Sequence, residues 1–569
     1  MGPPEPGAAP SPGQEQVELY VRTYRSLLRS SGEVRLQALE RSHLEMQSSL
    51  HPLGADTRLD AGALLYALHR LPPVVLQLEH VRLGQAPERL LHLAGTTASD
   101  WEQVVAPGRR RRWWWHRGLR TLAVALASSS DLDDLVPTLV ALQIEWNKAH
   151  LLLQGVEADR SAGPVVSQVQ VDLGIAADDY ERLRQLFQQR LETFLDAVRS
   201  RPLDLGIQLL GGTQVGYARA TREWWRPIGD VIREQRLQDR PLYFVSSNGH
   251  SLVNVLSGVA RLRRSQVLEW VAQSGDVELR RLAAQVETPG SRLSKENFLY
   301  YAARRWFEQR PEERRRRGEE ERQEGIFHIP SQSGTDVAAQ VIVLDRLRAA
   351  SLDSRLRPGE GALAASPHLI LNLQYPLGQA AYHILRQVLE ATERVDGVYI
   401  LGKAATLNAA VGDVLIADVV HDEQSGNTYW LNNCFSYAQL APLVGGRAVL
   451  DRQRAVSVRS TFLQNRGYLA RYYHDAYTIV EMEAGPFLGA VFEAGDNSRY
   501  PAEEQVDLTR PQMEVGVIHY ASDTPYTQAR TLGARGLRFE GMEATYAGAL
   551  AIAGRILERC QAGPPSAAG

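Results

Sequence analysis

Three segments near the end of the chain carry polar side chains where predicted strands finish. Residues 399–423 read YILGKAATLNAAVGDVLIADVVHDE, residues 479–485 read IVEMEAG, and residues 518–525 read IHYASDTP. We expect a turn at Gly402 directly after the first strand, because a glycine lets a ligand approach the backbone closely. Ligands of open α/β sheets bind at the carboxyl ends of strands, so the three segments together indicate a binding site.

The sequence around these segments predicts the sheet that must position them. Short apolar runs such as HLILNL, GVYIL, GDVLIADVV, AVSVRST, YTIVEME and EVGVIHYAS are typical of strands. Helical patterns separate some of them, including residues 379–388 and 543–557. Buried strands interleaved with helices predict an α/β domain over residues 326–560, with a mixed central sheet flanked by helices.

The rest of the chain has a different pattern. Apolar residues at helical spacing predict a mainly α-helical N-terminal domain over residues 16–303. Residues 304–325 are a mixed-charge run with a proline and two glycines, which indicates a linker. Residues 1–15 and the tail at 561–569 are rich in Pro, Gly and Ala, and we expect both to be disordered.

Two polar segments of the N-terminal domain each have two interpretations. Residues 246–251, SSNGHS, follow a short predicted strand and are either a capping turn or a second ligand site, since helix N-termini attract anions. Arginines at 109–112 precede tryptophans at 113–115. That cluster is either a helix start or subunit contact, or a contact to a nucleotide or nucleic acid.

Composition excludes several classes of protein. The 63 basic and 66 acidic residues give a net charge of -3, so no nucleic-acid or membrane partner is expected. Cys434 and Cys560 are far apart and have no metal-ligand spacing. No G-x-G-x-x-G, Walker pattern, secretory signal or long apolar run is present, so we expect a cytoplasmic protein without cofactor or metal.

The order of the three segments resembles the nucleoside phosphorylase and nucleosidase superfamily. This superfamily includes purine nucleoside phosphorylases, methylthioadenosine/S-adenosylhomocysteine nucleosidases and AMP nucleosidase. Its V-E-M-E motif is present unchanged at Val480–Glu483, and its S-D motif is present at Ser522–Asp523. Gly402 and residues 411–418 match its turn and apolar strand. The resemblance covers roughly residues 325–560, and residues 17–303 have no such counterpart.

The resemblance implies a role for each matching residue. Asp523 would donate a proton to N7 of a departing purine, and Glu483 would accept hydrogen bonds from the ribose hydroxyls. Met482 would pack on the sugar and Phe462 would stack on the base. The predicted site is completed by Glu481, Ser522, Gly402 and Lys403. Cleaving an N-glycosidic bond develops negative charge on the base, so a general acid placed there lowers the barrier.

The nucleophile, water or phosphate, stays open. Relatives carry a Gly-Ser-Ala-Gly-Gly type of turn where this chain has Gly402 to Thr406 with Lys403 in second place. Lys403 is either a phosphate contact or a lysine of the surface or a subunit interface. Because no phosphate-binding arginines are evident, hydrolysis is slightly favoured. Four carboxylates are candidates for activating water by position alone: Asp336, Asp345, Asp422 and Glu423.

The leading interpretation is therefore an enzyme of purine metabolism, a nucleosidase or nucleoside phosphorylase. Its partners would be a purine nucleoside or nucleotide, with inorganic phosphate if it is a phosphorylase, and we expect a homo-oligomer. The first alternative is a non-catalytic sensor or scaffold that binds a nucleoside or nucleotide in the same pocket. The second is an α/β domain whose motifs match by chance.

Overall fold

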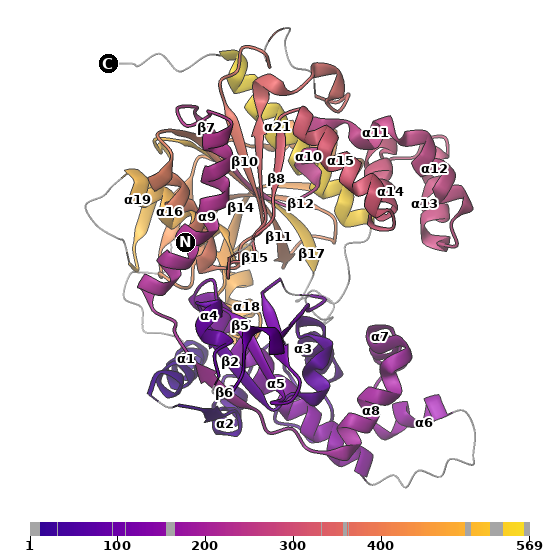
Figure 1. Cartoon of the computed structure of the whole chain (residues 1–569), viewed down its shortest axis with the longest axis vertical. Helices are drawn as coiled ribbons and strands as arrows, with labels where there is room; N and C mark the ends of the chain where they lie inside the picture. The colour runs from indigo at the N-terminus through magenta and orange to yellow at the C-terminus, as the bar shows by residue number, and fades with distance from the viewer. Residues whose placement is uncertain are drawn as a thin grey trace.

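The chain folds into two lobes, each built around its own β-sheet, as the computed structural model in Figure 1 shows. The first lobe, at the bottom of the view, holds the N-terminal helices, and the second holds the C-terminal ones. The structure describes residues 12–30, 32–93, 95–108, 110–154, 165–331, 333–356, 361, 363–495, 502–523 and 539–562. A helix with the length and hydropathy needed to cross a membrane is not found within these ranges.

Helices make up most of the regular structure of the first lobe, but a six-stranded mixed sheet that was not predicted runs through it in the order β1-β6-β2-β5-β4-β3. The central strand β2 pairs in parallel with β5 and β6, whereas the outer pairs are antiparallel. The strands are β1 Val34–Arg35, β2 His80–Gly84, β3 Glu102–Val104, β4 Trp113–His116, β5 Thr121–Ala125 and β6 Gly206–Leu209. Strands of two to five residues carry too little periodicity to stand out between long helices.

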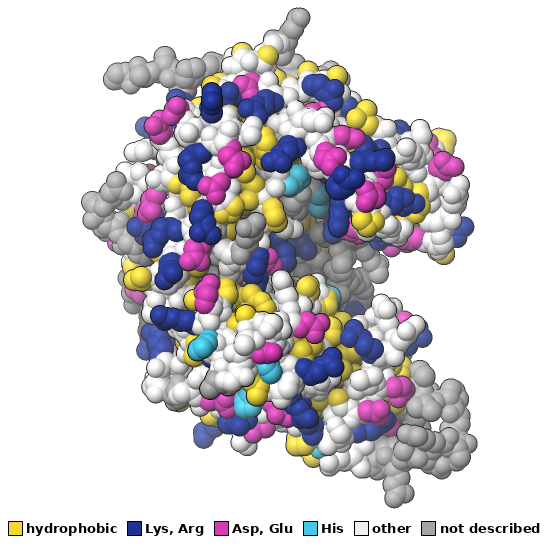
Figure 2. All heavy atoms as spheres, viewed as in Figure 1, with side chains coloured by type: hydrophobic (Ala, Val, Ile, Leu, Met, Phe, Trp, Pro, Cys, Tyr) yellow, Lys and Arg dark blue, Asp and Glu magenta, His cyan; other side chains and the backbone are white. Residues whose placement is uncertain are grey.

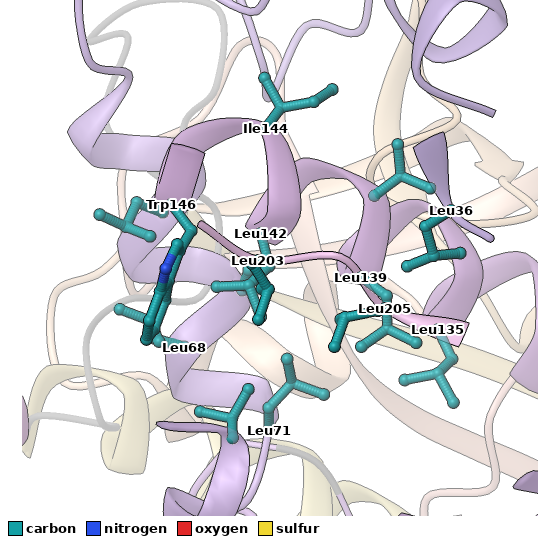
Figure 3. Packing of buried hydrophobic residues seen from close by; sticks show 14 of the residues in the cluster. Leu36, Leu68, Leu71, Leu135, Leu139, Leu142, Ile144, Trp146, Leu203 and Leu205 are labelled. Carbon is teal, nitrogen blue, oxygen red and sulfur yellow. The ribbon is translucent and has the colours of Figure 1, made fainter. Parts of the chain in front are cut away.

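Helix α5 is the centre of the first lobe. Its leucines and Trp146 pack against Leu36, which lies directly before α2, against Leu68 of α3 and against the leucines before β6, as Figure 3 shows. The helices are α1 Pro12–Ser30, α2 Gln37–Glu45, α3 Ala61–Arg70, α4 Pro87–Leu90, α5 Ser129–Gln154, α6 Val165–Asp172, α7 Ala177–Phe187 and α8 Leu191–Ser200, with 3-10 turns η1 Pro73–Gln77, η2 Ala98–Asp100 and η3 Gln188–Arg190. Helix α1 thus begins inside the stretch predicted to be disordered, and the predicted tail beyond residue 562 lies outside the described residues.

The second sheet has eleven strands. Helices flank it, so this part of the chain is α/β, as predicted. Its order is β16-β13-β12-β14-β15-β11-β7-β10-β9-β8, and β17 pairs with both β11 and β12. Strands β11, β17, β12, β14 and β15 therefore form a closed ring. The strands are β7 Leu242–Ser247, β8 Ile326–Ile329, β9 Ala339–Val343, β10 Leu369–Gln374, β11 Val395–Thr406, β12 Val414–Asp422, β13 Thr428–Leu431, β14 Val449–Ser457, β15 Tyr477–Glu481, β16 Gln505–Leu508 and β17 Glu514–Asp523.

Two layers of helices cover this sheet. Residues of α10, α12, α13, α14 and α21 form the buried cluster on one face, and residues of α9, α16 and α19 form the cluster on the other. The helices are α9 Gln214–Glu234, α10 Ser251–Ser257, α11 Val259–Leu262, α12 Arg264–Gln273, α13 Val277–Glu287, α14 Lys295–Glu308, α15 Pro311–Gln323, α16 Gln379–Ala391, α17 Tyr437–Leu440, α18 Arg466–His474, α19 Ala484–Gly495 and α21 Phe539–Ala562, with 3-10 turns η4 Leu344–Arg346, η5 Ala349–Ser351 and η6 Ala441–Leu443.

The predicted boundary between the domains is wrong. Strand β7 lies between β10 and β11 and pairs in parallel with both, so the second lobe already includes residues far ahead of position 304. The charged run predicted as a linker forms α15 instead. Ion pairs one turn apart, such as Arg315–Glu319 at 2.8 Å, stabilise this solvent-facing helix, which explains its composition.

Candidate active site

The V-E-M-E and S-D segments flank the same end of strand β11. Val480 of β15 pairs with Ala405, and on the other side of β11 Asp523 pairs with the same residue. The structure therefore brings together two segments that are about forty residues apart in the sequence, as expected for ligand-binding groups at the ends of strands. The Ser522 hydroxyl donates a 3.2 Å hydrogen bond to the carbonyl oxygen of Ala404. The side chain of Asp523 lies outside the side chains that the structure describes.

Glu483 lies at this end of the sheet with the half-buried Tyr375 and the buried Tyr520. The Tyr375 and Tyr520 hydroxyls are 3.3 Å apart. Burial raises the pKa of both tyrosines, and the negative charge of Glu483 adds to the rise. Glu483 and Met482 are both partly buried, and Met482 packs on a small apolar cluster that includes Ala405 and Val480. A carboxylate beside phenolic hydroxyls can hold the hydroxyl groups of a polar ligand.

The carboxylate of Glu481 is surrounded by hydrogen-bond donors of the protein, which is not the environment that a substrate contact would need. Its Oε2 atom accepts hydrogen bonds from the amides of Glu483 and Ala484 at 2.6 and 2.8 Å, and its Oε1 atom accepts one from the Ser457 hydroxyl. His519 Nε2 lies 3.7 Å from Oε2. Burial opposes ionisation, but His519 and these donors hold the pKa of Glu481 below its ordinary value. The structure therefore corrects the predicted role, because Glu481 anchors the start of α19.

Replacing Glu481 with alanine is expected to destabilise the fold by about 3–5 kcal/mol. The change leaves the amides of Glu483 and Ala484 and the Ser457 hydroxyl without their acceptor, which is the costly way to break a buried charged network. Chemical denaturation followed by circular dichroism measures the loss. Glu390→Ala is the matched control, because its side chain is 58% exposed, and it should change stability by less than about 0.5 kcal/mol. Equal stability of the two variants would contradict this role.

Gly402 and Lys403 lie inside β11 and not in a turn after it, because the strand continues to Thr406. The predicted turn is therefore wrong. A Cβ atom at Gly402 would lie 3.2 Å from Cδ2 of His519, so the glycine makes room for this buried ring. Lys403 is exposed on β11. It lies two residues before Ala405, the residue with which both motif segments pair.

Phe462 does not present a face for stacking on a base. Its side chain is 1% exposed and packs among Leu50, Ala63, Tyr66 and Ala141 of the first lobe. Its ring centroid lies 5.1 Å from that of Tyr66 at an angle of 82°. The resemblance located the aromatic residue by spacing, but the segment after β14 leaves the second sheet and enters the first lobe.

The segment 246–251, at the end of β7, reaches the same edge of the sheet. Asn248 Oδ1 accepts hydrogen bonds from the amides of His250 and Ser251 at 3.0 and 2.6 Å, which is the geometry of a capping turn. The Ser247 carbonyl accepts a 3.1 Å bond from the amide of Tyr375, so the segment helps to place this tyrosine. Burial lowers the pKa of His250 to about 3, so its ring is neutral. Sequence reasoning singled out these residues but placed them in the other domain.

The arginines of the first lobe contact this edge. Arg110 Nη2 donates a 2.9 Å hydrogen bond to the carbonyl oxygen of Tyr375, and Arg112 donates one to the carbonyl oxygen of Ser331. Arg111 is buried between Asp131 and Asp134, at 2.7 Å from each. The following tryptophans form β4 and not the start of a helix. This cluster therefore joins the two lobes.

Comparison with known proteins gives a family but no activity. A profile described as "Family of unknown function (DUF6909)" matches residues 36–558. The chain belongs to this family. No curated protein matches it. Among solved structures it is similar to a candidate methylthioadenosine nucleosidase from Weissella paramesenteroides ATCC 33313, with 12% identity, a TM-score of 0.26, and coverage of 41% of this chain and 90% of that one.

The DUF6909 match spans both lobes, and the structure shows how they are held together at the candidate site. The Ser130 hydroxyl, in the first turn of α5, accepts hydrogen bonds from the amide of Gln379 at 2.9 Å and from the side chain of Gln424 at 2.8 Å. Arg459 forms a 2.8 Å ion pair with Glu18 of α1. The surface is hollowed between the lobes on one side of the molecule (Figure 2). The first lobe therefore covers part of the edge where the motifs meet.

Three of the four carboxylates predicted as water activators in this DUF6909 chain have protein partners. Asp345 forms a 2.8 Å ion pair with Arg240. Asp422 accepts a 2.6 Å hydrogen bond from Ser425 in the turn after β12, and Glu423 accepts one of 2.8 Å from Tyr472. Each of these three carboxylates therefore has a structural role. Within the described residues no group of three His, Cys, Asp or Glu side chains could hold a metal ion.

Proposed function

We propose that this protein cleaves the N-glycosidic bond of a purine nucleoside or nucleotide at the end of β11. The observation that carries the proposal is the pairing of β15 and β17 with the same residue, Ala405. It brings the Glu483 segment and the Ser522–Asp523 segment to the two sides of one strand end. One carboxylate for the sugar and one acid for the base are the groups that this reaction needs.

Each residue has a defined task in this proposal. Asp523 protonates N7 of the leaving purine, and Ser522, bonded to Ala404, fixes the strand end that carries it. Glu483 accepts hydrogen bonds from the ribose hydroxyls, and Met482 packs on the sugar. Glu481 holds Glu483 in place, because its carboxylate accepts a hydrogen bond from the amide of Glu483. It takes no part in binding the substrate. The proton from Asp523 neutralises the negative charge that develops on the base, which lowers the electrostatic cost of the transition state.

Arg110 brings positive charge to the same place from the first lobe. Its guanidinium binds the carbonyl of Tyr375, whose hydroxyl lies 3.3 Å from that of Tyr520. Lys403 adds a second cation on β11. Two cations near a sugar-binding carboxylate favour a phosphorylated substrate or inorganic phosphate as the second reactant.

Release of free base tests the proposal directly. The purified chain is incubated with adenosine, inosine, guanosine, methylthioadenosine, S-adenosylhomocysteine, AMP and ATP, each with and without phosphate, and the products are separated by HPLC. Base release supports the proposal, and its dependence on phosphate distinguishes phosphorolysis from hydrolysis. Binding without base release from any substrate would favour a nucleotide sensor instead.

Replacing Lys403 with alanine should raise the KM for phosphate or for a phosphorylated substrate about tenfold. Removing a charged hydrogen-bond donor costs about 1.5–3 kcal/mol, which corresponds to at least a tenfold change in affinity. Steady-state kinetics at varied phosphate concentration measure the effect. Lys295→Ala is the control, because Lys295 pairs with Glu287 on the surface of α14. Unchanged phosphate dependence in Lys403→Ala would remove this lysine from the site.

A further inference from the structure

A cysteine, a histidine and an aspartate meet at the opposite edge of the second sheet. His368 lies directly before β10, Asp396 is the second residue of β11, and Cys560 lies near the end of α21. His368 Nε2 is 3.0 Å from Asp396 Oδ2, and its Nδ1 atom is 3.7 Å from Cys560 Sγ. This edge holds the amino ends of the parallel strands, so the cluster is separate from the candidate site for base cleavage.

The imidazole of His368 is held in one orientation. Tyr243 stacks on it with ring centroids 5.0 Å apart and an interplanar angle of 25°. Asp396, itself bound by Arg394 at 2.5 Å, occupies Nε2, and Nδ1 faces both the Ser366 hydroxyl at 3.2 Å and the sulfur of Cys560. Burial lowers the pKa of His368, but its hydrogen bonds to Asp396 and Cys560 outweigh burial and raise it to about 9. With this pKa the ring is protonated at neutral pH, so Asp396 holds an imidazolium beside the sulfur, and this cation favours the thiolate.

Cys560 is half-buried and its sulfur has polar neighbours. The Ser366 hydroxyl donates a 3.1 Å hydrogen bond to Sγ, which favours negative charge on sulfur. A polar cleft of about 910 Å³ has the neighbouring residues Asp396 and Arg559 in its wall, but the cysteine that lines it is Cys434 and not Cys560. Reactive cysteines are found in such partly exposed, polar surroundings next to a base or a cation.

Cys434 offers a contrast within the same chain. It is also half-buried, but it faces the carboxylate of Glu514, whose effect on the thiol Arg555 offsets only in part. Burial and Glu514 raise the pKa of its thiol far above the ordinary value, so it stays protonated. Differences in reactivity between the two cysteines therefore report their chemical surroundings and not simply exposure.

We propose that Cys560 is a nucleophilic cysteine, activated by His368 and Asp396, that is oxidised by small hydroperoxides. The sulfur attacks the nearer peroxide oxygen, an S–O bond forms and the O–O bond breaks. The attacking sulfur is the thiolate, whose proton has gone to solvent. The imidazolium of His368 gives its Nδ1 proton to the departing hydroxide, which leaves as water, and the ring regains a proton from solvent. Sulfur loses two electrons to the peroxide and becomes a sulfenic acid. The half-buried position of Cys560 suits a small, polar oxidant better than a bulky electrophile.

The experiment compares both cysteines in one molecule. The native chain is exposed to hydrogen peroxide, the reaction is quenched, and the remaining thiols are alkylated after denaturation. Peptide mass spectrometry then gives the fraction of each cysteine that has gained oxygen. We expect Cys560 to be oxidised at least about tenfold faster than Cys434. Equal rates, or faster oxidation of Cys434, would overturn the proposal.

A pair of histidine variants tests the mechanism. His368→Gln should slow oxidation of Cys560 by about 10²-fold, the usual contribution of a positioned general acid. His474→Gln is the matched control, because His474 forms a similar pair with Asp475 at 3.2 Å on the surface and should leave the rate unchanged. An unchanged Cys560 rate in His368→Gln would overturn the role of the imidazole. If that variant does not fold, as judged by circular dichroism, Asp396→Asn replaces it with the same expected direction.

Discussion

Replacing Asp523 with asparagine should slow base release by about 10²–10⁴-fold while substrate binding persists. Asparagine keeps the shape of the side chain and can still accept a hydrogen bond, but it has no acidic proton to give to the departing base. General acids contribute rate enhancements of this size. Because Asp523 pairs with Ala405 through the backbone, the substitution leaves the strand pairing intact. The effect should therefore appear in kcat and much less in the dissociation constant.

Single-turnover base release and isothermal titration calorimetry separate the two quantities. Asp507→Asn is the control, since Asp507 lies exposed on the edge strand β16 and binds only the nearby Thr509. The control should keep full activity. A fully active Asp523→Asn variant would contradict the assigned acid, and a variant that loses binding and turnover together would point to a binding role instead.

The sequence was sufficient to predict the strands of the candidate site. The segments around Val480 and Ile518 are runs of buried apolar residues, and each ends in polar residues. Such a pattern follows directly from a strand that crosses a core and emerges at the edge of a sheet. The α/β character of the C-terminal half is confirmed for the same reason.

Long-range pairing limited the rest of the fold prediction. Strand β7 has its partners β10 and β11 more than a hundred residues downstream, beyond a group of helices that no periodicity links to the sheet. The charged helix α15 hid this connection, because its composition is also typical of a linker. The strands of the first lobe were missed because runs as short as Trp113–His116 are compatible with a helix as well.

Residue roles were harder to predict than strands, because motif matching does not show what a side chain touches. Glu481 and Glu483 stand two apart in one motif, yet Glu481 binds the amides that begin α19, whereas Glu483 lies beside Tyr375 and Tyr520. A buried carboxylate with three donors is a structural group. The distinction depends on tertiary contacts and therefore requires the structure.

The first lobe also controls how the candidate site is held. The connection from β14 to β15 leads directly into the V-E-M-E motif, and it passes through the first lobe on the way. The amide of Ser49 donates a 2.7 Å hydrogen bond to the carbonyl oxygen of Gln464, and Asn465 Nδ2 donates one of the same length to the carbonyl oxygen of Met46. The position of Glu483 thus depends on packing between the lobes, which gives a second way to disturb the site.

Replacing Phe462 with alanine is expected to cost about 3–5 kcal/mol of stability, because it empties a fully buried ring site. The ring contacts Tyr66 and lies near His43 and His51, which are linked by a 3.0 Å hydrogen bond. Thermal and chemical unfolding measure the loss.

Tyr437→Ala serves as the control for Phe462→Ala, because Tyr437 is 56% exposed and its removal should cost less than about 0.5 kcal/mol. The measurement distinguishes the two roles considered for Phe462. A base-stacking residue would raise KM on substitution and leave stability nearly unchanged, since its face would be open to the ligand. A residue that joins the lobes lowers the unfolding midpoint first, and activity falls with it because the chain to Glu483 is no longer anchored. Contacts on all sides of the Phe462 ring favour the second outcome.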